Sequence, residues 1–314
     1  SGMKPKIFIK NLYLTGEKNQ VLLKTPLSEL EIDIFKSLKK RKITIGKFTI
    51  NDTSINLKHD ELNISFNNIN LFKKSDRLNN IEVPLIVFNN SVLRFINVQT
   101  NKSEIFKIQN LIASLKDDVV RVNAKFIHNS STEPITFIYK GNQNQNDIKS
   151  KIYLSANSIK LPYDILPQAI RQLEADRMSV RLWISMKQTS IVKIVGNISS
   201  ESLNLKMNQD ILNIKNINSD LLYVNNNTSN ILSLMRMNYK IKEKKINNNK
   251  IVLYKNDDDD VKIFIKKSDA ELLRLLTKET ILKNIRPINK IINSNISNLQ
   301  IHLTKKNVID YFSL

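Results

Sequence analysis

The sequence predicts a mainly β fold, built from antiparallel strands that each have one apolar and one polar face. Runs in which apolar and polar residues alternate recur along the chain, and residues 62–67 (Leu-Asn-Ile-Ser-Phe-Asn) are the cleanest copy. Alternation puts successive side chains on opposite faces of a pleated strand. Polar turns separate the runs about every ten residues, which favours a meander of strands over a βαβ alternation. Only five glycines occur in 314 residues, which favours long, regular strands.

Strands are expected wherever an alternating or apolar run lies between polar turns. The second run, for example, carries Leu30, Ile32 and Ile34 on one face and acidic residues on the other. The expected strands cover residues 6–14, 27–34, 43–50, 54–57, 62–71, 83–88, 92–98, 105–115, 119–126, 135–139, 148–155, 179–186, 191–198, 203–207, 211–217, 220–224, 251–254, 261–265 and 296–303.

Two short amphipathic helices are expected to interrupt the strands. After Pro162, which suits the first turn of a helix, apolar residues recur at helical spacing. They are Ile165, Leu166, Ala169, Ile170 and Leu173. The second helix is expected to begin near Ser268, which has capping-box spacing to Glu271, and to end before Pro287.

The formal net charge of +20 raises the question of a nucleic-acid partner. Most lysines are scattered, but basic clusters lie at 36–42 and 240–245. No aromatic residues that could stack on bases are interleaved with them. We therefore expect no nucleic-acid partner, and an anionic membrane surface suits the two clusters better. A polyanion binder is the weakest alternative.

Residue types that carry catalysis are scarce or scattered. Cysteine is absent, and the glycines form no phosphate-binding loop. The histidines, His59, His128 and His302, lie far apart in sequence, which favours structural roles over metal ligation. The four aspartates at 257–260 lack the spacing and the glycine of a calcium loop, which favours a solvated turn. We expect no enzyme activity, no cofactor and no metal site.

The apolar strand faces are therefore the main candidate for a functional surface. In one interpretation two sheets pack face to face, and the apolar residues form the core of a sandwich. In the other, one long sheet curls into an open trough whose apolar inner face binds an apolar ligand. The alternation is the same in both.

Two segments carry a resemblance to a known family. The opening residues 5–14 (Pro-Lys-Ile-Phe-Ile-Lys-Asn-Leu-Tyr-Leu), and residues 157–162 (Asn-Ser-Ile-Lys-Leu-Pro) before the first expected helix, resemble the AsmA-like family, within it the periplasmic YhdP and TamB branch. The resemblance implies an elongated, curled antiparallel sheet that forms an apolar groove, similar to that of the bridge-like lipid transfer proteins. It carries over no catalytic residues.

This resemblance implies a groove segment over residues 1–156 and a helix-containing β segment over 157–314 that continues the same sheet. We expect a non-catalytic module that shields phospholipid acyl chains between the inner and outer bacterial membranes. The expected location is the periplasm, with the option of an inner-membrane anchor in a segment outside this chain. The alternative function is a structural or adhesive β-sandwich that binds a protein partner. Alternation assigns the groove face to Leu62, Ile64, Phe66, Val122, Phe126, Phe137, Leu182, Ile184, Leu203, Leu205 and Met207.

Overall fold

The structure, a computed structural model, is mainly β, as predicted. It divides the chain into two compact units, one of Ser1–Leu154 with Pro162–Gln168 and one of Ser155–Leu161 with Ala169–Leu314. The described residues are 4–15, 21–59, 85–97, 102–116, 119–131, 133–142, 149–160, 173–188, 190–207, 210–226, 228–241, 244–256, 260–268, 296–303 and 309–313.

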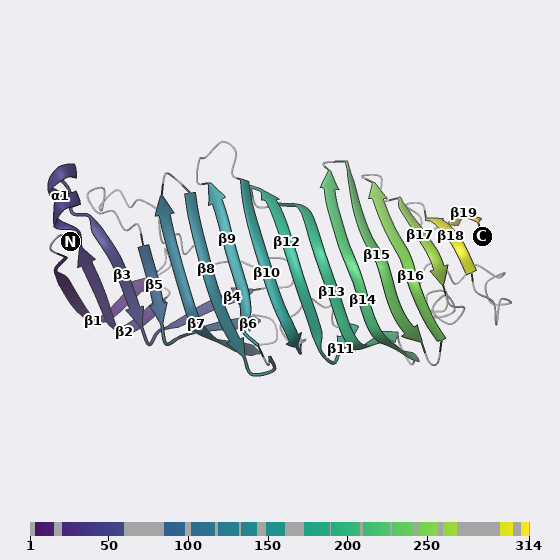
Figure 1. The fold of residues 1–314 in the computed structure, drawn as a ribbon, viewed down its shortest axis with the longest axis horizontal. Coiled ribbons are helices and arrows are strands. Elements are labelled where there is room, and N and C mark those ends of the chain that lie inside the picture. Colours follow the sequence, from purple (N-terminus) through teal and green to yellow (C-terminus); the bar gives the residue numbers. More distant parts are fainter. Residues whose placement is uncertain are drawn as a thin grey trace. The chain divides into compact units, whose positions relative to one another are not determined.

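The first unit is a sheet whose strands lie side by side along most of the unit (Figure 1). Its described elements are β1 (Lys6–Thr15), β2 (Val21–Ile32), α1 (Ile34–Lys40), β3 (Ile45–Asn51), β4 (Ser54–His59), β5 (Leu85–Asn89), β6 (Ser91–Asn97), β7 (Ser103–Lys116), β8 (Val119–His128) and β9 (Ile135–Asn142). The unit boundary falls within β10 (Lys149–Ile159), which pairs with β9.

Most neighbouring strands of this unit are antiparallel, but β3–β5 and β4–β6 are parallel. β3 and β4 follow one another as two halves of a bent strand, and β5 and β6 do the same beside them. Parallel neighbours need a long connection between them. Residues 60–84 supply it, and the expected strand at 62–71 falls there, outside the described residues.

The second unit is an antiparallel series in chain order from β12 onward, and β11 also pairs with β13. Its elements are β11 (Leu173–Ala175), β12 (Met178–Lys187), β13 (Ser190–Met207), β14 (Asp210–Asn226), β15 (Ser229–Ile241), β16 (Lys244–Asn256), β17 (Val261–Ser268), β18 (Ile296–Leu303) and β19 (Ile309–Ser313). β13 and β14 each join two strands that the sequence predicted separately. The sequence analysis missed β11, β15 and β19.

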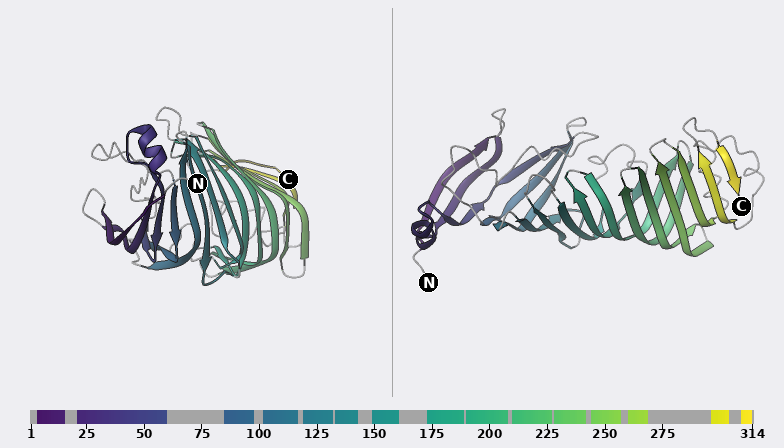
Figure 2. Two further views of the ribbon diagram at one scale, coloured as in Figure 1. Left: turned by 60° about the vertical axis from the view of Figure 1, so that its left-hand side comes forward. Right: turned by 90° about the horizontal axis from the view of Figure 1, so that it is seen from above.

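A backbone kink recurs in the long strands of both units. One residue of such a strand, usually an asparagine, adopts the left-handed region with φ between 46° and 59°. These residues are Asn11, Asp52, Asn90, Ser158, Asn216, Arg236, Asn248 and Asn298. The bend is visible where β4 and β6 run at a shallow angle behind β7, β8 and β9 (Figure 1), and in the curved green strands of the second unit (Figure 2).

Each kink shifts the phase of the alternation by one residue. On β15, Leu234, Met237 and Tyr239 belong to one apolar cluster although the first two are three positions apart, and Arg236 lies between them. In an unkinked strand, residues three apart would point to opposite faces. The kink therefore keeps the apolar side chains on one face while the strand changes direction.

The face that carries the buried clusters is called the core face of each unit. In the first unit the buried residues are Ile50, Ile55, Ile86, Phe88, Ile108 and Ala113. In the second they are Ile214, Ile217, Met237, Tyr239, Ile241 and Ile246. Both clusters contain residues from the two sides of a kink, so the deepest burial lies along the bend.

Hydroxyl side chains satisfy backbone groups along the bend of the first unit. The buried Thr25 hydroxyl donates to the Asn51 carbonyl at 2.7 Å, and the Thr53 hydroxyl donates to the Lys24 carbonyl. The buried Ser91 hydroxyl accepts the backbone N–H of Thr53 at 3.3 Å. Buried backbone groups without partners are costly, so these residues stabilise the interrupted ladder.

The helices differ from the prediction. α1 was not predicted, because only seven residues form it and the alternation before it continues almost to its start. The predicted helices after Pro162 and Ser268 fall on residues 161–172 and 269–295, outside the described residues. Leu173, which the spacing placed in the first of them, begins β11 instead.

Asn90→Val tests the requirement for left-handed backbone at the kink. A β-branched residue is strained in this region, so we expect the free energy of unfolding to fall by about 1–2 kcal/mol. Asn90→Gly should retain stability, since glycine adopts this conformation without strain. Urea unfolding measures both. Asn123→Val, on the ordinary strand β8, is the control, and an equal loss in that variant would contradict the role of the kink.

Asn249→Leu tests polar satisfaction at the bend of the second unit. The fully buried Asn249 side chain accepts the backbone N–H groups of Lys250 and Lys267, both at 2.8 Å. Its amide also donates to the Tyr239 hydroxyl at 3.2 Å. Leucine would leave both N–H groups unpaired, and we expect a loss of about 2–4 kcal/mol in urea unfolding. Asn247→Leu, exposed on the same strand, should change stability little.

Candidate functional site

The core face of the second unit carries a cross-strand row of apolar side chains, here called the outer row. Each member is the direct partner of the next across the strands β12 to β17, and each side chain is partly exposed. The row consists of Ile184, Ile194, Tyr223, Leu232, Leu253 and Ile263. No polar residue interrupts it except for the Tyr223 hydroxyl, which donates to Asn230 at 3.0 Å.

A second row, here called the inner row, runs beside the outer row and nearer the bend. It extends from β12 to β18 through Leu182, Gly196, Leu221, Leu234, Ile251, Ile265 and Leu299. At Gly196 an added Cβ would clash with the backbone carbonyl oxygen of Arg181 and come within 2.9 Å of Leu182, so this strand pair needs a glycine for close approach. Ile265 and Leu299 are buried, whereas Leu182, Leu221, Leu234 and Ile251 are partly exposed.

Burial on this core face therefore decreases with distance from the bend. Side chains at the bend, such as Tyr239 and Ile241, are almost fully buried. In the inner row Ile265 and Leu299 are buried and the other side chains are partly exposed, whereas every member of the outer row is partly exposed. Away from the bend, the core face therefore carries apolar side chains that remain partly exposed.

The core face of the first unit has the same organisation. One row passes through Phe48, Ile86, Ala113, Val122 and Tyr139, and the next through Ile50, Phe88, Leu111, Ala124 and Phe137. Ile50 and Phe88 are buried, whereas Val122, Phe137 and Tyr139, on β8 and β9, are partly exposed.

The predicted groove residues fall into three sets. Val122, Phe126 and Phe137 share the core face of the first unit, where Val122 and Phe126 pack against the buried cluster. In the second unit Ile184 lies in the outer row, Leu182 in the inner row, and Leu203 packs against the cluster. Leu205 and Met207 lie on β13, but their side chains, and all of Leu62, Ile64 and Phe66, lie outside the described part of the chain.

The sequence analysis missed most members of the outer row. Tyr223 was within an expected strand, but Leu232 belongs to β15, which the asparagine-rich residues 225–230 concealed. Leu253 and Ile263 lay in the expected strands 251–254 and 261–265, but neither was assigned to the groove face. The signal that was missed is the one-residue shift in the alternation at each kink. Because of this shift, one long strand looks like two short alternating runs in the sequence.

A polar cluster lies at one end of the core face in the first unit. His128 Nε2 lies 3.0 Å from the Glu104 carboxylate, and His128 Nδ1 lies 2.6 Å from the Ser130 hydroxyl. Nδ1 also accepts the Ser130 backbone N–H at 3.2 Å, and the ring packs on Phe106 with 4.7 Å between centroids. The Ser–His–Glu connectivity resembles a catalytic triad. Because both groups that meet Nδ1 come from the turn after β8, the cluster acts to hold that turn.

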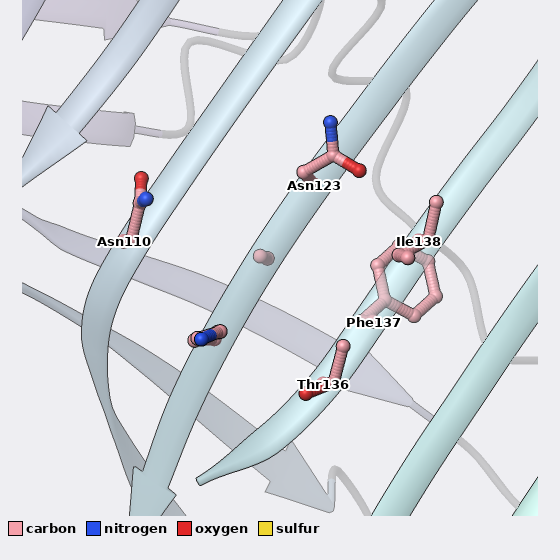
Figure 3. A pocket seen from close by; sticks show the side chains of 7 residues that line it. Asn110, Asn123, Thr136, Phe137 and Ile138 are labelled. Carbon is pink, nitrogen blue, oxygen red and sulfur yellow. The ribbon is translucent and has the colours of Figure 1, made fainter.

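A small hollow lies over β7, β8 and β9 of the first unit (Figure 3). Its volume is about 190 Å³, and it is lined by Asn110, Asn123, Ala124, Lys125, Thr136, Phe137 and Ile138. Pockets for drug-sized ligands have volumes of roughly 300–1,000 Å³. This hollow is too small for such a ligand, and the extended apolar rows are the stronger candidate.

Residues 33–43, here called the basic tip, form the other notable surface of the first unit. The tip contains α1, and its side chains include Lys36, Lys39, Lys40, Arg41 and Lys42 against one acid, Asp33. Three of its apolar side chains are strongly exposed: Phe35 at 63%, Leu38 at 72% and Ile43 at 54%.

Local hydrogen bonds hold the basic tip in place. The Asp33 carboxylate caps α1 by accepting the Lys36 backbone N–H at 2.9 Å, and the Ser37 hydroxyl accepts the Thr44 N–H at 2.9 Å. The cap lowers the pKa of the Asp33 carboxyl, chiefly through the Lys36 N–H and further through the Lys36 cation. A lowered pKa means that the cap stabilises the fold above the ordinary pKa and is lost as pH falls through the lowered value. At neutral pH the cap is complete.

The described residues carry few features of other kinds of site. No described helix is long and apolar enough to cross a membrane. In the described part of the chain, no group of three or more His, Cys, Asp or Glu side chains is placed to hold a metal ion. No family model matches the chain, and no curated protein or solved structure matches it either.

Proposed function

We propose that this protein is a non-catalytic lipid-binding and transfer module whose core face forms an apolar groove for phospholipid acyl chains. The observation that carries the proposal is the outer row, in which six partly exposed apolar side chains follow one another across β12 to β17. Large accessible apolar surfaces mark binding sites in soluble proteins. The ligand that fits an elongated apolar strip is itself elongated and apolar.

The length of the outer row suits an acyl chain. Neighbouring strands lie about 4.8 Å apart, so five intervals span roughly 24 Å. An acyl chain spans roughly 15 Å in one leaflet of a bilayer with a hydrocarbon core of about 30 Å. Each methylene removed from water contributes about 0.8 kcal/mol. The row is therefore long enough to cover a whole acyl chain.

The arrangement of the strands favours a groove over a sandwich. In a sandwich the inner face of one sheet packs on a second sheet. In each unit the described strands belong to one hydrogen-bonded sheet, which bends on itself, and the described residues form no separate second sheet. This is the specific point on which the alternative of an adhesive β-sandwich lacks support.

The proposal includes the setting that the AsmA-like resemblance implies. The module would act in the periplasm and pass phospholipids between the inner and outer membranes of a bacterium. Its role would be passive, since the groove shields the apolar chains while the polar headgroups stay in water. No cofactor and no catalytic residue take part.

Copurified lipid tests the proposal directly. Protein purified without detergent is extracted with organic solvent, and the extract is analysed by mass spectrometry. We expect phospholipid in at least a roughly equimolar amount. Removing the apolar surface and an acyl chain from water is favourable, so the protein should bind any lipid that is available. Repeated absence of lipid, together with failure to take up fluorescent phospholipid from vesicles, would overturn the proposal.

Ile194→Glu tests whether the outer row holds the lipid. A carboxylate in an apolar contact surface must be desolvated or protonated, so bound lipid should fall to less than about half of the wild-type amount. Val195→Glu is the matched control, since Val195 is the next residue and lies exposed on the opposite face, paired with Trp183. The control should retain its lipid and its thermal unfolding temperature. Equal loss in both variants would contradict the assignment of the core face.

A further inference from the structure

The basic tip combines two properties that single surface residues do not have together. Isolated exposed apolar residues are common on soluble proteins. Here Phe35, Leu38 and Ile43 are all more than half exposed within nine residues, among five basic side chains. Apolar residues beside a dense cationic patch are typical of segments that lie in the interface of an anionic membrane.

The second basic cluster, at 240–245, provides an internal comparison. The apolar neighbours of its described lysines are Tyr239, Ile241 and Ile246, and all three are buried. That cluster presents charge without accessible apolar groups. The basic tip is therefore the stronger candidate for a membrane contact.

The tip is also fixed in position by its connections. The Ser37 hydroxyl donates to the Asp33 carbonyl at 2.7 Å and accepts the Thr44 N–H, which ties α1 to the chain that enters β3. Arg41 ends the helix in the left-handed region and donates its N–H to the Leu38 carbonyl. These hydrogen bonds hold the backbone of the basic tip, which limits how far its exposed side chains can fold back onto the protein.

A neighbouring cleft of about 470 Å³ adds room for lipid groups at the same place. It is lined by Ile32, Ile34, Ser37, Leu38, Arg41, Lys42 and Ile43. The lining combines apolar side chains with Arg41 and Lys42, which matches the apolar and anionic parts of a phospholipid.

We propose that the basic tip docks the first unit on the surface of an anionic phospholipid bilayer. Phe35, Leu38 and Ile43 enter the headgroup region, and the surrounding cations contact lipid phosphates. This inference goes beyond the proposed transfer function, because docking requires no lipid on the core face. An acidic protein surface is the other conceivable partner, and the experiment distinguishes it.

Vesicle flotation of the full chain tests the proposal. The probes are vesicles of phosphatidylcholine alone and vesicles containing 30% phosphatidylglycerol, an amount that makes the surface roughly as anionic as natural membranes. We expect binding to the anionic vesicles, binding to the neutral vesicles at least about tenfold weaker, and loss on raising the salt. No binding to anionic vesicles, or equal binding to both kinds, would overturn the proposal.

Two variants locate the contact. Phe35→Ser/Leu38→Ser removes two exposed apolar groups, and Lys39→Glu reverses one charge. Each should weaken binding to anionic vesicles about tenfold or more. The matched controls are Ile105→Ser/Ile138→Ser and Lys107→Glu, which change exposed residues on β7 and β9 of the same unit. If charge reversal weakens binding and the serine variant does not, contact is electrostatic only, and entry of Phe35 and Leu38 into the bilayer is wrong.

The lipid content of the same variants separates the two proposals. Tip variants should keep the copurified lipid of the wild-type protein while they lose vesicle binding, whereas Ile194→Glu should show the reverse. A tryptophan at the tip, Phe35→Trp in a Trp183→Phe background, gives a second readout. Its emission should shift to the blue on anionic vesicles, and an unchanged spectrum in the bound state would contradict insertion of the tip.

Discussion

The structure depends on one backbone constraint, which is the left-handed residue that recurs where the long strands bend. A strand that bends without a change of phase would turn its apolar side chains toward solvent beyond the bend. The single left-handed residue, as at Asn216 or Asn248, changes the phase and the direction together. Asparagine tolerates this conformation better than most residues because its short polar side chain interacts locally with the backbone. Asparagine therefore takes left-handed positions that would otherwise favour glycine, so kinked strands can form in a chain with only five glycines.

The bend also determines which polar residues are buried. A kinked ladder leaves backbone groups without regular partners, and small hydroxyl or amide side chains supply replacements. Thr25, Thr53 and Ser91 do this on adjacent strands of the first unit, and Ser200 does it in the second unit, where its hydroxyl lies 2.8 Å from the Arg177 carbonyl. These buried polar residues are part of the scaffold. They lie beside the buried apolar clusters along the bend.

Sequence alternation was sufficient to predict the fold class and most strands, because period two is a local property. It was not sufficient to predict their connection into long bent strands. Residues 191–198 and 203–207 read as two strands, although they form the single strand β13, since the phase change between them looks like a turn. The parallel pairs β3–β5 and β4–β6 were also beyond prediction, because pairing between distant segments leaves no local pattern. For the site, alternation placed Leu182 and Ile184 on one face of a strand, but only the register across six strands joins such residues into a row.

The gradient of burial connects the scaffold to the proposed function. Near the bend, the two arms of each strand and the side chains between them leave little apolar surface exposed, and this region stabilises the fold. Farther out, the same pattern continues with partly exposed side chains, at Ile194, Leu232 and Leu253 for example. Folding alone does not require that continuation, since exposed apolar area lowers solubility and contributes little to stability. The high net positive charge offsets the solubility cost by repulsion between molecules. The outer row is therefore the part of the scaffold on which the proposed binding of acyl chains rests.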